Sequence, residues 1–298
     1  MSKSTIDNNF YQTLMINNME KNPFSLFDFL GYFIPGAFFM FLCFFLQQQG
    51  GILYYLKVKN IQEFNDNVSI IYATFFVIFS YILGHILSFL STLTIENFTV
   101  WMFGFPSKNL LKFEKEKKYF VEKDNCCLTI LSYILRLLLF LFLLPISFFS
   151  ITIGKLFDLN RSVYTKSLDD IYIKLIKSRV YHIFKKMGKK GEVSLEKFDF
   201  HKLLIYYSYN TNISHQPKLM NYVALYGFLR VCCLIFNILS LYFLVLIFID
   251  SEEKTISDCI ICLVSSILAY ITYLGYLKFY RRYSQENLMI LLLEDKKQ

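Results

Sequence analysis

The sequence lacks the short patterns that mark most enzymes and metal-binding proteins. It has no glycine-rich phosphate-binding loop, no Walker pattern and no internal repeat. Lysines stand where a calcium loop ahead of GEVSLEKF would need a ladder of Asp and Asn. The polar first 28 residues also do not resemble a cleavable signal peptide. We therefore expect a protein that is not an enzyme and that uses no cofactor.

Cysteine is present, but not in a pattern that indicates disulfides. The seven cysteines are an odd number and fall in or beside apolar stretches: Cys43, Cys126, Cys127, Cys232, Cys233, Cys259 and Cys262. Buried reduced thiols that pack as small apolar side chains explain this placement. Cys259 and Cys262 have the spacing of a redox or metal pair, but no second pair accompanies them. Packing is the favoured interpretation, and we expect no metal site.

Apolar residues dominate what is present. They make up 55% of the chain, with 33 Phe and 22 Tyr. Each apolar block can cross a hydrocarbon core of ~30 Å as a helix that rises ~1.5 Å per residue. Pro35 and Gly36 should bend the first block, and Pro145 splits the third. We predict an all-α, multi-pass transmembrane bundle whose blocks are residues 29–46, 68–90, 126–153, 222–249 and 257–276.

The Lys and Arg residues between the blocks predict how the chain is threaded. Residues 91–125 carry six and residues 154–221 carry thirteen, whereas residues 49–67 carry two and residues 250–256 carry one. Basic loops of membrane proteins usually lie on the cytoplasmic side. Both basic segments can do so only if the block at 126–153 re-enters or lies in the interface as a hairpin. We therefore expect four crossings in a bacterial inner (plasma) membrane, with both termini cytoplasmic.

This threading divides the chain into four parts. Residues 1–28 form an N-terminal cytoplasmic or interfacial segment, and residues 29–153 hold two crossings, a loop and the hairpin. Residues 154–221 form a basic cytoplasmic helical module, and residues 222–298 hold two crossings and a basic tail. The expected partners are the lipid bilayer, a further copy of the chain and a soluble protein at the module. Nucleic acid is the least favoured partner, because no aromatic residues are interleaved with the charges.

Small residues form a stripe on the second apolar block. Ser80, Gly84 and Ser88 are four residues apart, so they share one helix face. Small side chains let helix backbones approach closely, and such packing drives helix association in lipid. The stripe predicts a helix-packing face that joins either two helices of one chain or two chains.

Ionisable residues follow that stripe. His85 and Glu96 are eleven residues apart and share a face with Thr92. Ionisable groups inside a membrane are candidates for proton or ion paths. A neutral imidazole that stiffens the bundle by bonding a neighbouring carbonyl is the favoured interpretation of His85.

Two arginines lie within apolar blocks. Arg230 occurs in YGFLRVCCLIFN, with Asn237 seven residues later on the same face, and Arg136 lies in the third block. An arginine in the middle of a membrane helix costs ~2.5–3.5 kcal/mol on insertion scales, so Arg230 needs a partner. Glu96 is predicted to be that partner, and an anion-selective pore lining is the lesser alternative. Arg136 is a second buried cation unless its block lies in the interface.

Two stretches resemble a known group of proteins. FDFLGYFIPGAFF and YILGHILSFLSTLTIENFTVWMFGFPSKNLL, together with LYGFLR, resemble a family of uncharacterised multi-pass bacterial membrane proteins. The resemblance covers the four crossings and brings no settled activity. It implies a setting in bacterial anti-phage defence, where small membrane proteins of this kind act as sensors or membrane-disrupting effectors.

Three functions fit these features. The first is a non-enzymatic, homo-oligomeric membrane effector or sensor that forms or gates a pore. The second is a membrane anchor that recruits a soluble partner through the basic module. The third and lowest-ranked is a lipid-modifying membrane enzyme that uses His85 and Glu96, which requires a bend to bring them together.

Overall fold

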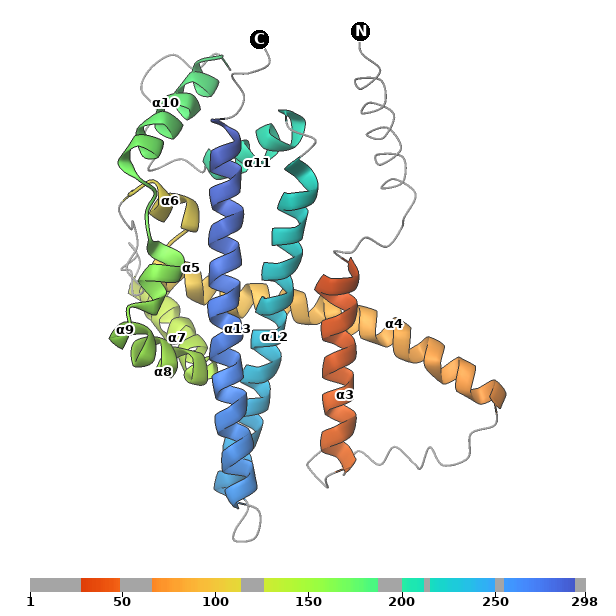
Figure 1. Cartoon of the computed structure of the whole chain (residues 1–298). Helices are drawn as coiled ribbons and strands as arrows, with labels where there is room; N and C mark the ends of the chain where they lie inside the picture. The colour runs from red at the N-terminus through yellow and green to blue at the C-terminus, as the bar shows by residue number, and fades with distance from the viewer. Residues whose placement is uncertain are drawn as a thin grey trace. The chain divides into compact units, whose positions relative to one another are not determined.

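The computed structural model of the chain (Figure 1) describes residues 28–48, 66–113, 126–186, 200–211, 215–249 and 255–292. Every regular element in these ranges is a helix, which confirms the all-α prediction. The predicted N-terminal segment 1–28 lies outside the described residues except for Asp28. The chain divides into two compact units, Met1–Gly84 and His85–Gln298.

Four described helices are long and apolar enough to cross a membrane: Phe29–Leu46, Ala73–Leu110, Gln216–Ile249 and Ile256–Ile290. A further pair, Thr129–Phe142 and Leu144–Leu156, passes the same test only when joined, and its two parts meet at 86°. The protein is therefore a multi-pass membrane protein with four apolar helices and one broken or re-entrant pair, as predicted.

The bent pair breaks where its proline predicts. Helix α7 (Cys126–Phe142) and helix α8 (Leu144–Ile151) are separated by the single residue Leu143. Pro145 is the second residue of α8. A proline has no N–H to donate, so it fits the first turn of a helix and not the interior. The sharp turn therefore comes directly ahead of Pro145.

In the first unit, two helices approach so closely that side chains are excluded between them. A Cβ added to Gly36, in α3 (Ile34–Gln48), would lie 1.8 Å from the backbone oxygen of Ser80 in α4 (Asp66–Ser91). A Cβ added to Gly84 would lie 1.9 Å from the backbone oxygen of Tyr32. The Ser80–Gly84 part of the predicted stripe therefore packs two helices of the same chain.

The irregularity predicted at Pro35 and Gly36 lies one turn earlier. Phe29–Phe33 form a short π-helix, η1, and α3 then starts with Pro35 as its second residue. Because Pro35 cannot donate a backbone hydrogen bond, the turn before it is left to rearrange.

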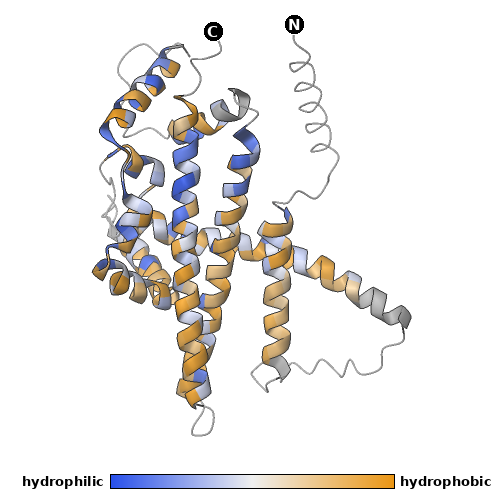
Figure 2. Ribbon diagram, in the orientation of Figure 1, coloured by the Kyte–Doolittle hydropathy of each residue, from blue (hydrophilic) through white to orange (hydrophobic). Residues whose placement is uncertain are grey.

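The second unit is built on two long adjacent helices (Figure 1), α12 (Gln216–Ile249) and α13 (Thr255–Ile290). Small polar groups join them: Ser240 Oγ and Ser266 Oγ are 2.7 Å apart, and Cys233 Sγ donates to the Ala269 carbonyl at 3.3 Å. Both helices run beyond the predicted apolar blocks 222–249 and 257–276. Figure 2 shows hydrophilic stretches in the added turns, and α13 then ends on apolar residues that include Leu288 and Ile290.

Shorter helices cover this pair. Helix α4 continues through a π-helix, η3 (Thr92–Glu96), into α5 (Asn97–Phe103) and then α6 (Pro106–Leu110). Gly104 ends α5 with a positive φ of 79°, a conformation that favours glycine, and its carbonyl accepts a bond from Tyr164 Oη at 3.0 Å. Tyr164 lies in η4 (Arg161–Thr165), which follows α9 (Ile153–Leu156).

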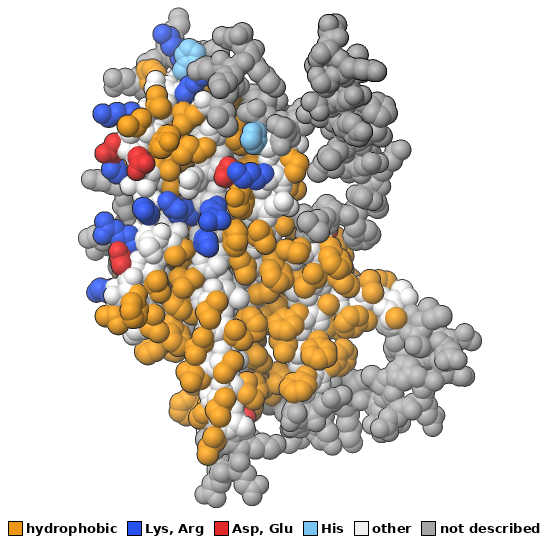
Figure 3. Space-filling model, in the orientation of Figure 1, with side chains coloured by type: hydrophobic (Ala, Val, Ile, Leu, Met, Phe, Trp, Pro, Cys, Tyr) orange, Lys and Arg blue, Asp and Glu red, His pale blue; other side chains and the backbone are white. Residues whose placement is uncertain are grey.

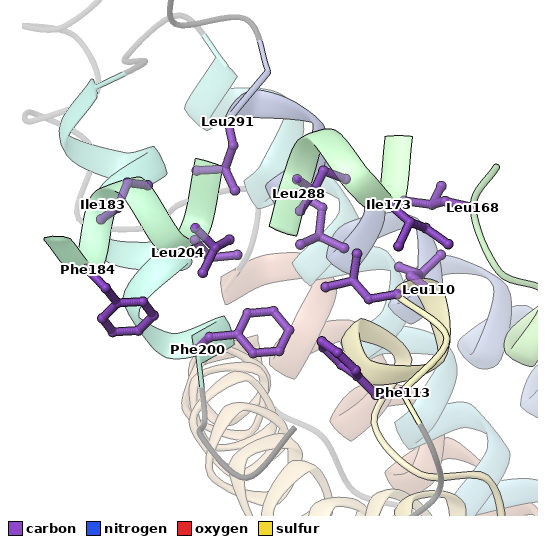
Figure 4. Packing of buried hydrophobic residues seen from close by; sticks show 13 residues of the cluster. Leu110, Phe113, Leu168, Ile173, Ile183, Phe184, Phe200, Leu204, Leu288 and Leu291 are labelled. Atoms are coloured by element: carbon purple, nitrogen blue, oxygen red, sulfur yellow. The ribbon is translucent and has the colours of Figure 1, made fainter. Parts of the chain in front are cut away.

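The helical module is α10 (Asp170–Lys186), α11 (Phe200–Thr211) and the residues packed on them at 110–113 and 288–291. Figure 4 shows their apolar side chains facing one another. The rings of Phe113 and Phe200 meet edge to face, 6.0 Å apart. The buried members of this core are Leu110, Leu111, Phe113, Leu168, Ile173, Ile176, Val180, Ile183, Phe184, Phe200, Leu204, Leu288 and Leu291. The core thus draws on residues well outside the predicted module 154–221, whose bounds stay a prediction.

An ion pair closes one edge of the module and gives a pH-dependent prediction. Lys112 Nζ donates to Asp170 Oδ1 at 2.6 Å, and this hydrogen bond lowers the pKa of Asp170 below its ordinary value. A lowered folded-state pKa means that the pair stabilises the fold above pH ~3.9 and is lost as the pH falls through the lowered pKa. Replacing Lys112 by Met should raise the titration midpoint of Asp170, measured from its carboxyl ¹³C shift. An unchanged midpoint would contradict the pairing.

Candidate functional site

Arg230 lies deep in the second unit and has the partner predicted for it. It follows the first residue of α12 by fourteen residues, about 21 Å along the helix, and it is only 8% exposed. Its Nη1 forms an ion pair with Glu96 Oε2, and its Nε donates to Ser91 Oγ at 3.1 Å. The pairing of Arg230 with Glu96 is thereby confirmed. We call Arg230, Glu96 and Ser91 the ion-pair site.

The π-helix η3 places both partners of Arg230 on one side. Ser91 and Glu96 are five residues apart, which would separate them by about 140° around a regular α-helix. In a π-helix the residue five positions ahead comes to lie over the first. The Ser91 hydroxyl also donates to the Ser88 carbonyl at 2.8 Å, which directs its oxygen lone pairs toward the arginine. The local irregularity is therefore what assembles the site.

Tyrosine rings lie near the ion-pair site, where Glu96 interacts electrostatically with Tyr164, Tyr276 and Tyr280, and the sequence analysis missed this feature. Tyr273, Tyr276, Tyr280 and Tyr283 recur every three or four residues on α13, so they lie along one face, and we call them the tyrosine ladder. Rings of adjacent members have centroids 6.2 Å apart at Tyr273–Tyr276 and 5.7 Å apart at Tyr276–Tyr280. The spacing in YITYLGYLKFYRRY was the signal that could have revealed it.

Two further tyrosines complete this shell from other helices. Tyr226 of α12 lies 5.3 Å from Tyr280 between ring centroids, and Tyr164 of η4 lies 6.3 Å from the same ring. Burial raises the pKa of Tyr164 well above its usual range, and its neighbour Tyr280 raises it further. Tyr164 therefore stays neutral and remains a donor. Aromatic walls of this kind exclude water, which strengthens the attraction within a buried ion pair.

Two fully buried tyrosines of the ladder differ in one hydrogen bond, which gives a matched prediction. Tyr273 Oη lies 3.2 Å from Thr99 Oγ1, whereas Tyr276 Oη has no partner among the described residues. Tyr273→Phe should lower the free energy of unfolding by about 1 kcal/mol, because it leaves Thr99 without this bond. Tyr276→Phe should be neutral or stabilising by about 1 kcal/mol, because it removes an unsatisfied hydroxyl. Equal losses for the two variants, measured by denaturant titration, would contradict this description.

Arg136 is also buried rather than open to water. It is 8% exposed, and its guanidinium carbon lies 4.8 Å from the centre of the Trp101 ring. A cation over the face of a tryptophan is attracted by the negative face of the ring. This contact attaches α7 to α5.

Asn237 supports the bend of the broken pair. Its Nδ2 donates to the Phe142 carbonyl at 2.9 Å, where α7 ends. Ser147 Oγ lies 3.2 Å from the Phe140 carbonyl at the same break. Freed carbonyls at membrane depth must find donors within the protein, because lipid offers none. Asn237 therefore holds the end of α7 against α12 at the bend.

Removing that donor gives a further prediction. Asn237→Leu should lower the free energy of unfolding by about 1–2 kcal/mol, because the Phe142 carbonyl loses its buried donor. Thr152→Val is the control, because it also loses a side-chain hydrogen bond to a backbone carbonyl, here from a hydroxyl on an exposed surface. The control should stay within about 0.5 kcal/mol of wild type in the same denaturant titration. A loss in the control as large as in Asn237→Leu would contradict a special role for the bend.

The structure does not bring His85 to Glu96. Eleven residues of helix separate them, about 16 Å, and His85 is exposed while Glu96 turns to Arg230. The paired acid and base that a lipid-modifying enzyme would need from these two residues is therefore not assembled. Within the ranges given above, no group of three or more His, Cys, Asp or Glu residues could hold a metal ion.

The predicted polar residues thus fall into separate structural roles. Glu96 and Arg230 meet in one ion pair, Asn237 caps the bend, Arg136 stacks on Trp101, and His85 is exposed. No protein-family model, curated protein or solved structure matches the chain. The resemblance to a family of bacterial membrane proteins stays a prediction. By helix length and hydropathy, the chain is a multi-pass helical membrane protein.

Proposed function

We propose that this protein is a non-enzymatic membrane sensor or effector, in which the helical module receives a signal and the ion-pair site responds to it. One observation supports the proposal above all. Helix α13 is uninterrupted from Thr255 to Ile290, so it carries both the tyrosine ladder and part of the module core at Leu288. A continuous helix transmits a tilt or rotation along its length better than two helices joined by a loop.

The ion-pair site has the properties of an element with two arrangements. A buried arginine with its carboxylate is stable when paired and costly when separated, so intermediate positions are disfavoured. Arg230 is on α12 and Glu96 is on η3, so a relative movement of these two helices would change the distance between the paired charges. Binding at the module would shift the balance only by as much as it prefers one arrangement over the other.

Ion flux from proteoliposomes tests the effector part of the proposal. Glu96→Gln removes the pair and should give constitutive potassium or chloride flux, because Arg230 is then driven to a new position. His85→Ala alters an exposed residue of the adjoining helix and should leave flux at the wild-type level. Absence of flux from Glu96→Gln, in protein shown to be inserted and folded, would overturn a gated effector.

The proposal includes self-association, through a face other than Ser80 and Gly84, which are occupied by helix packing within the chain. Mass photometry in native lipid nanodiscs tests this part. Four or more chains per particle would support a pore, and single chains would remove it. The setting in anti-phage defence rests only on the resemblance and would be tested by phage challenge of cells that carry Glu96→Gln.

A membrane anchor is the alternative, and one observation favours it. Ile171 and Leu175 lie one turn apart on α10 and are 73% and 51% exposed. Space-filling Figure 3 shows apolar side chains on the surface above the charged row, at the level of the module. If the module recruits a soluble protein here, Leu175→Glu should abolish recruitment by the full-length chain and leave ion flux unchanged.

A further inference from the structure

A row of Lys and Arg side chains lies between the apolar surface and the module (Figure 3). Four cations that we group together come from two segments that are distant in sequence. Lys278, Arg281 and Arg282 follow the apolar part of α13, and Lys166 follows η4. We call these four residues the basic band.

Contacts hold the two segments of the basic band together. Arg281 donates to the backbone carbonyl of Lys166 from Nε at 3.2 Å and from Nη2 at 2.9 Å. The tilted rings of Tyr164 and Tyr280, whose centroids are 6.3 Å apart, join the same two segments beside this contact. The band is therefore built by the fold and is not a chance run of charge along one helix.

The acidic residues that the structure describes do not neutralise the exposed charges of the basic band. Lys166, Lys278 and Arg282 are exposed, and none of them forms an ion pair with a described acidic residue. Lys278 lies three and four residues before Arg281 and Arg282, so the three share one face and repel one another. No Asp or Glu occurs in α13 between Asp258 and Glu286. None of the described acidic residues therefore supplies a counter-charge, which leaves these cations open to an external anion.

The position of the basic band identifies the source of that counter-charge. The lipid-facing surface of α13 begins at Ile256, which is 79% exposed. Lys278 follows twenty-two residues later, about 33 Å along the helix, which matches a hydrocarbon core of about 30 Å. Lys278 therefore stands at the level of lipid phosphates.

We propose that the basic band binds the head groups of anionic lipids and so fixes the start of the module against the membrane surface. Clusters of Lys and Arg immediately beside a membrane helix attract anionic lipids in this way. Arg281 is held by its bonds to Lys166, so its guanidinium is already oriented, which suits phosphate recognition. This inference does not depend on the sensor proposal, because it concerns a surface that is separate from the ion-pair site.

Native mass spectrometry of the full-length chain tests the proposal, with phosphatidylglycerol and phosphatidylcholine as the lipid probes. Wild type should retain phosphatidylglycerol in preference to phosphatidylcholine. The double variant Lys278→Gln/Arg282→Gln should lower that retention by about tenfold, because it removes two surface charges. The control Lys174→Gln/Lys185→Gln removes two exposed lysines of α10 and should retain the lipid as wild type does.

Three results would overturn the anionic-lipid site. They are equal retention of the two lipids by wild type, equal loss in the band and control variants, and full displacement of the lipid by inorganic phosphate. The first would mean no headgroup preference, the second a general charge effect, and the third a site for free anions. None of them would change the flux expected from Glu96→Gln, so the two proposals fail independently.

Discussion

Replacing Glu96 by glutamine should lower the free energy of unfolding by about 3 kcal/mol. The change leaves the guanidinium of Arg230 buried without its counter-charge, and breaking one side of a buried ion pair costs about 3–5 kcal/mol. The lower end applies because the Glu96 side chain is 28% exposed. Denaturant titration of the protein in mixed micelles measures the loss.

Two comparisons make this prediction specific. Lys218 and Glu286 form a more exposed ion pair between α12 and α13 at 2.9 Å, so Glu286→Gln should cost at most about 1 kcal/mol. The double variant Glu96→Gln/Arg230→Met removes both buried charges and should be more stable than Glu96→Gln alone. If Glu286→Gln lowered the free energy of unfolding as much as Glu96→Gln, the Arg230–Glu96 pair would contribute no more stability than an exposed pair.

Replacing Gly84 by alanine should cost about 3 kcal/mol, near the upper end of the range for overpacking. The added Cβ would lie 1.9 Å from the backbone oxygen of Tyr32, and a backbone cannot move aside as the end of a side chain can. The two helices of the first unit must then separate. Gly36→Ala should behave in the same way, because its Cβ would lie 1.8 Å from the Ser80 oxygen.

Gly227→Ala is the matched control for these glycine variants. An added Cβ at Gly227 meets no heavy atom within 4 Å, so the variant should gain up to about 1 kcal/mol from the better helix propensity of alanine. Gly84→Ala and Gly36→Ala together should cost less than the sum of the single variants. Both force the same two helices apart, so the second substitution meets a contact that is already broken. Wild-type stability of Gly84→Ala would contradict the close approach.

The membrane fold could be predicted from the sequence because it depends on local composition. Blocks of apolar residues need no tertiary information to be identified as spans, and Pro145 marks its own bend. The pairing of Arg230 with Glu96 could also be predicted, because the cost of an isolated charge in lipid leaves few choices of partner.

Other features depended on contacts between distant residues. The sequence predicts that the fifth apolar block ends at Tyr276, and the Lys and Arg residues after it indicate a membrane interface. Lys and Arg are also good helix formers, so the helix continues beyond the predicted apolar block. The π-helix η3 at Thr92–Glu96 has no sequence signature as clear as a proline. Its role in bringing Ser91 to Arg230 is evident only from the structure.

The module core shows the same limit. Residues 110–113 and 288–291 both contribute to this core although they are far apart in the sequence. Neither segment has an unusual composition. Their apolar side chains could equally have faced lipid. Only the three-dimensional arrangement shows that the end of α13 belongs to the module and not to the membrane region alone.

Hydrogen–deuterium exchange of Glu96→Gln in nanodiscs tests the central claim, that α13 couples the ion-pair site to the module. If α13 couples them, exchange should be faster in α10. Exchange in α3 should be unchanged, which would exclude global unfolding as the cause. His85→Ala should leave both regions at the wild-type rate. Unchanged exchange in α10, together with a local change around Arg230, would show that the two parts are independent and would contradict the account.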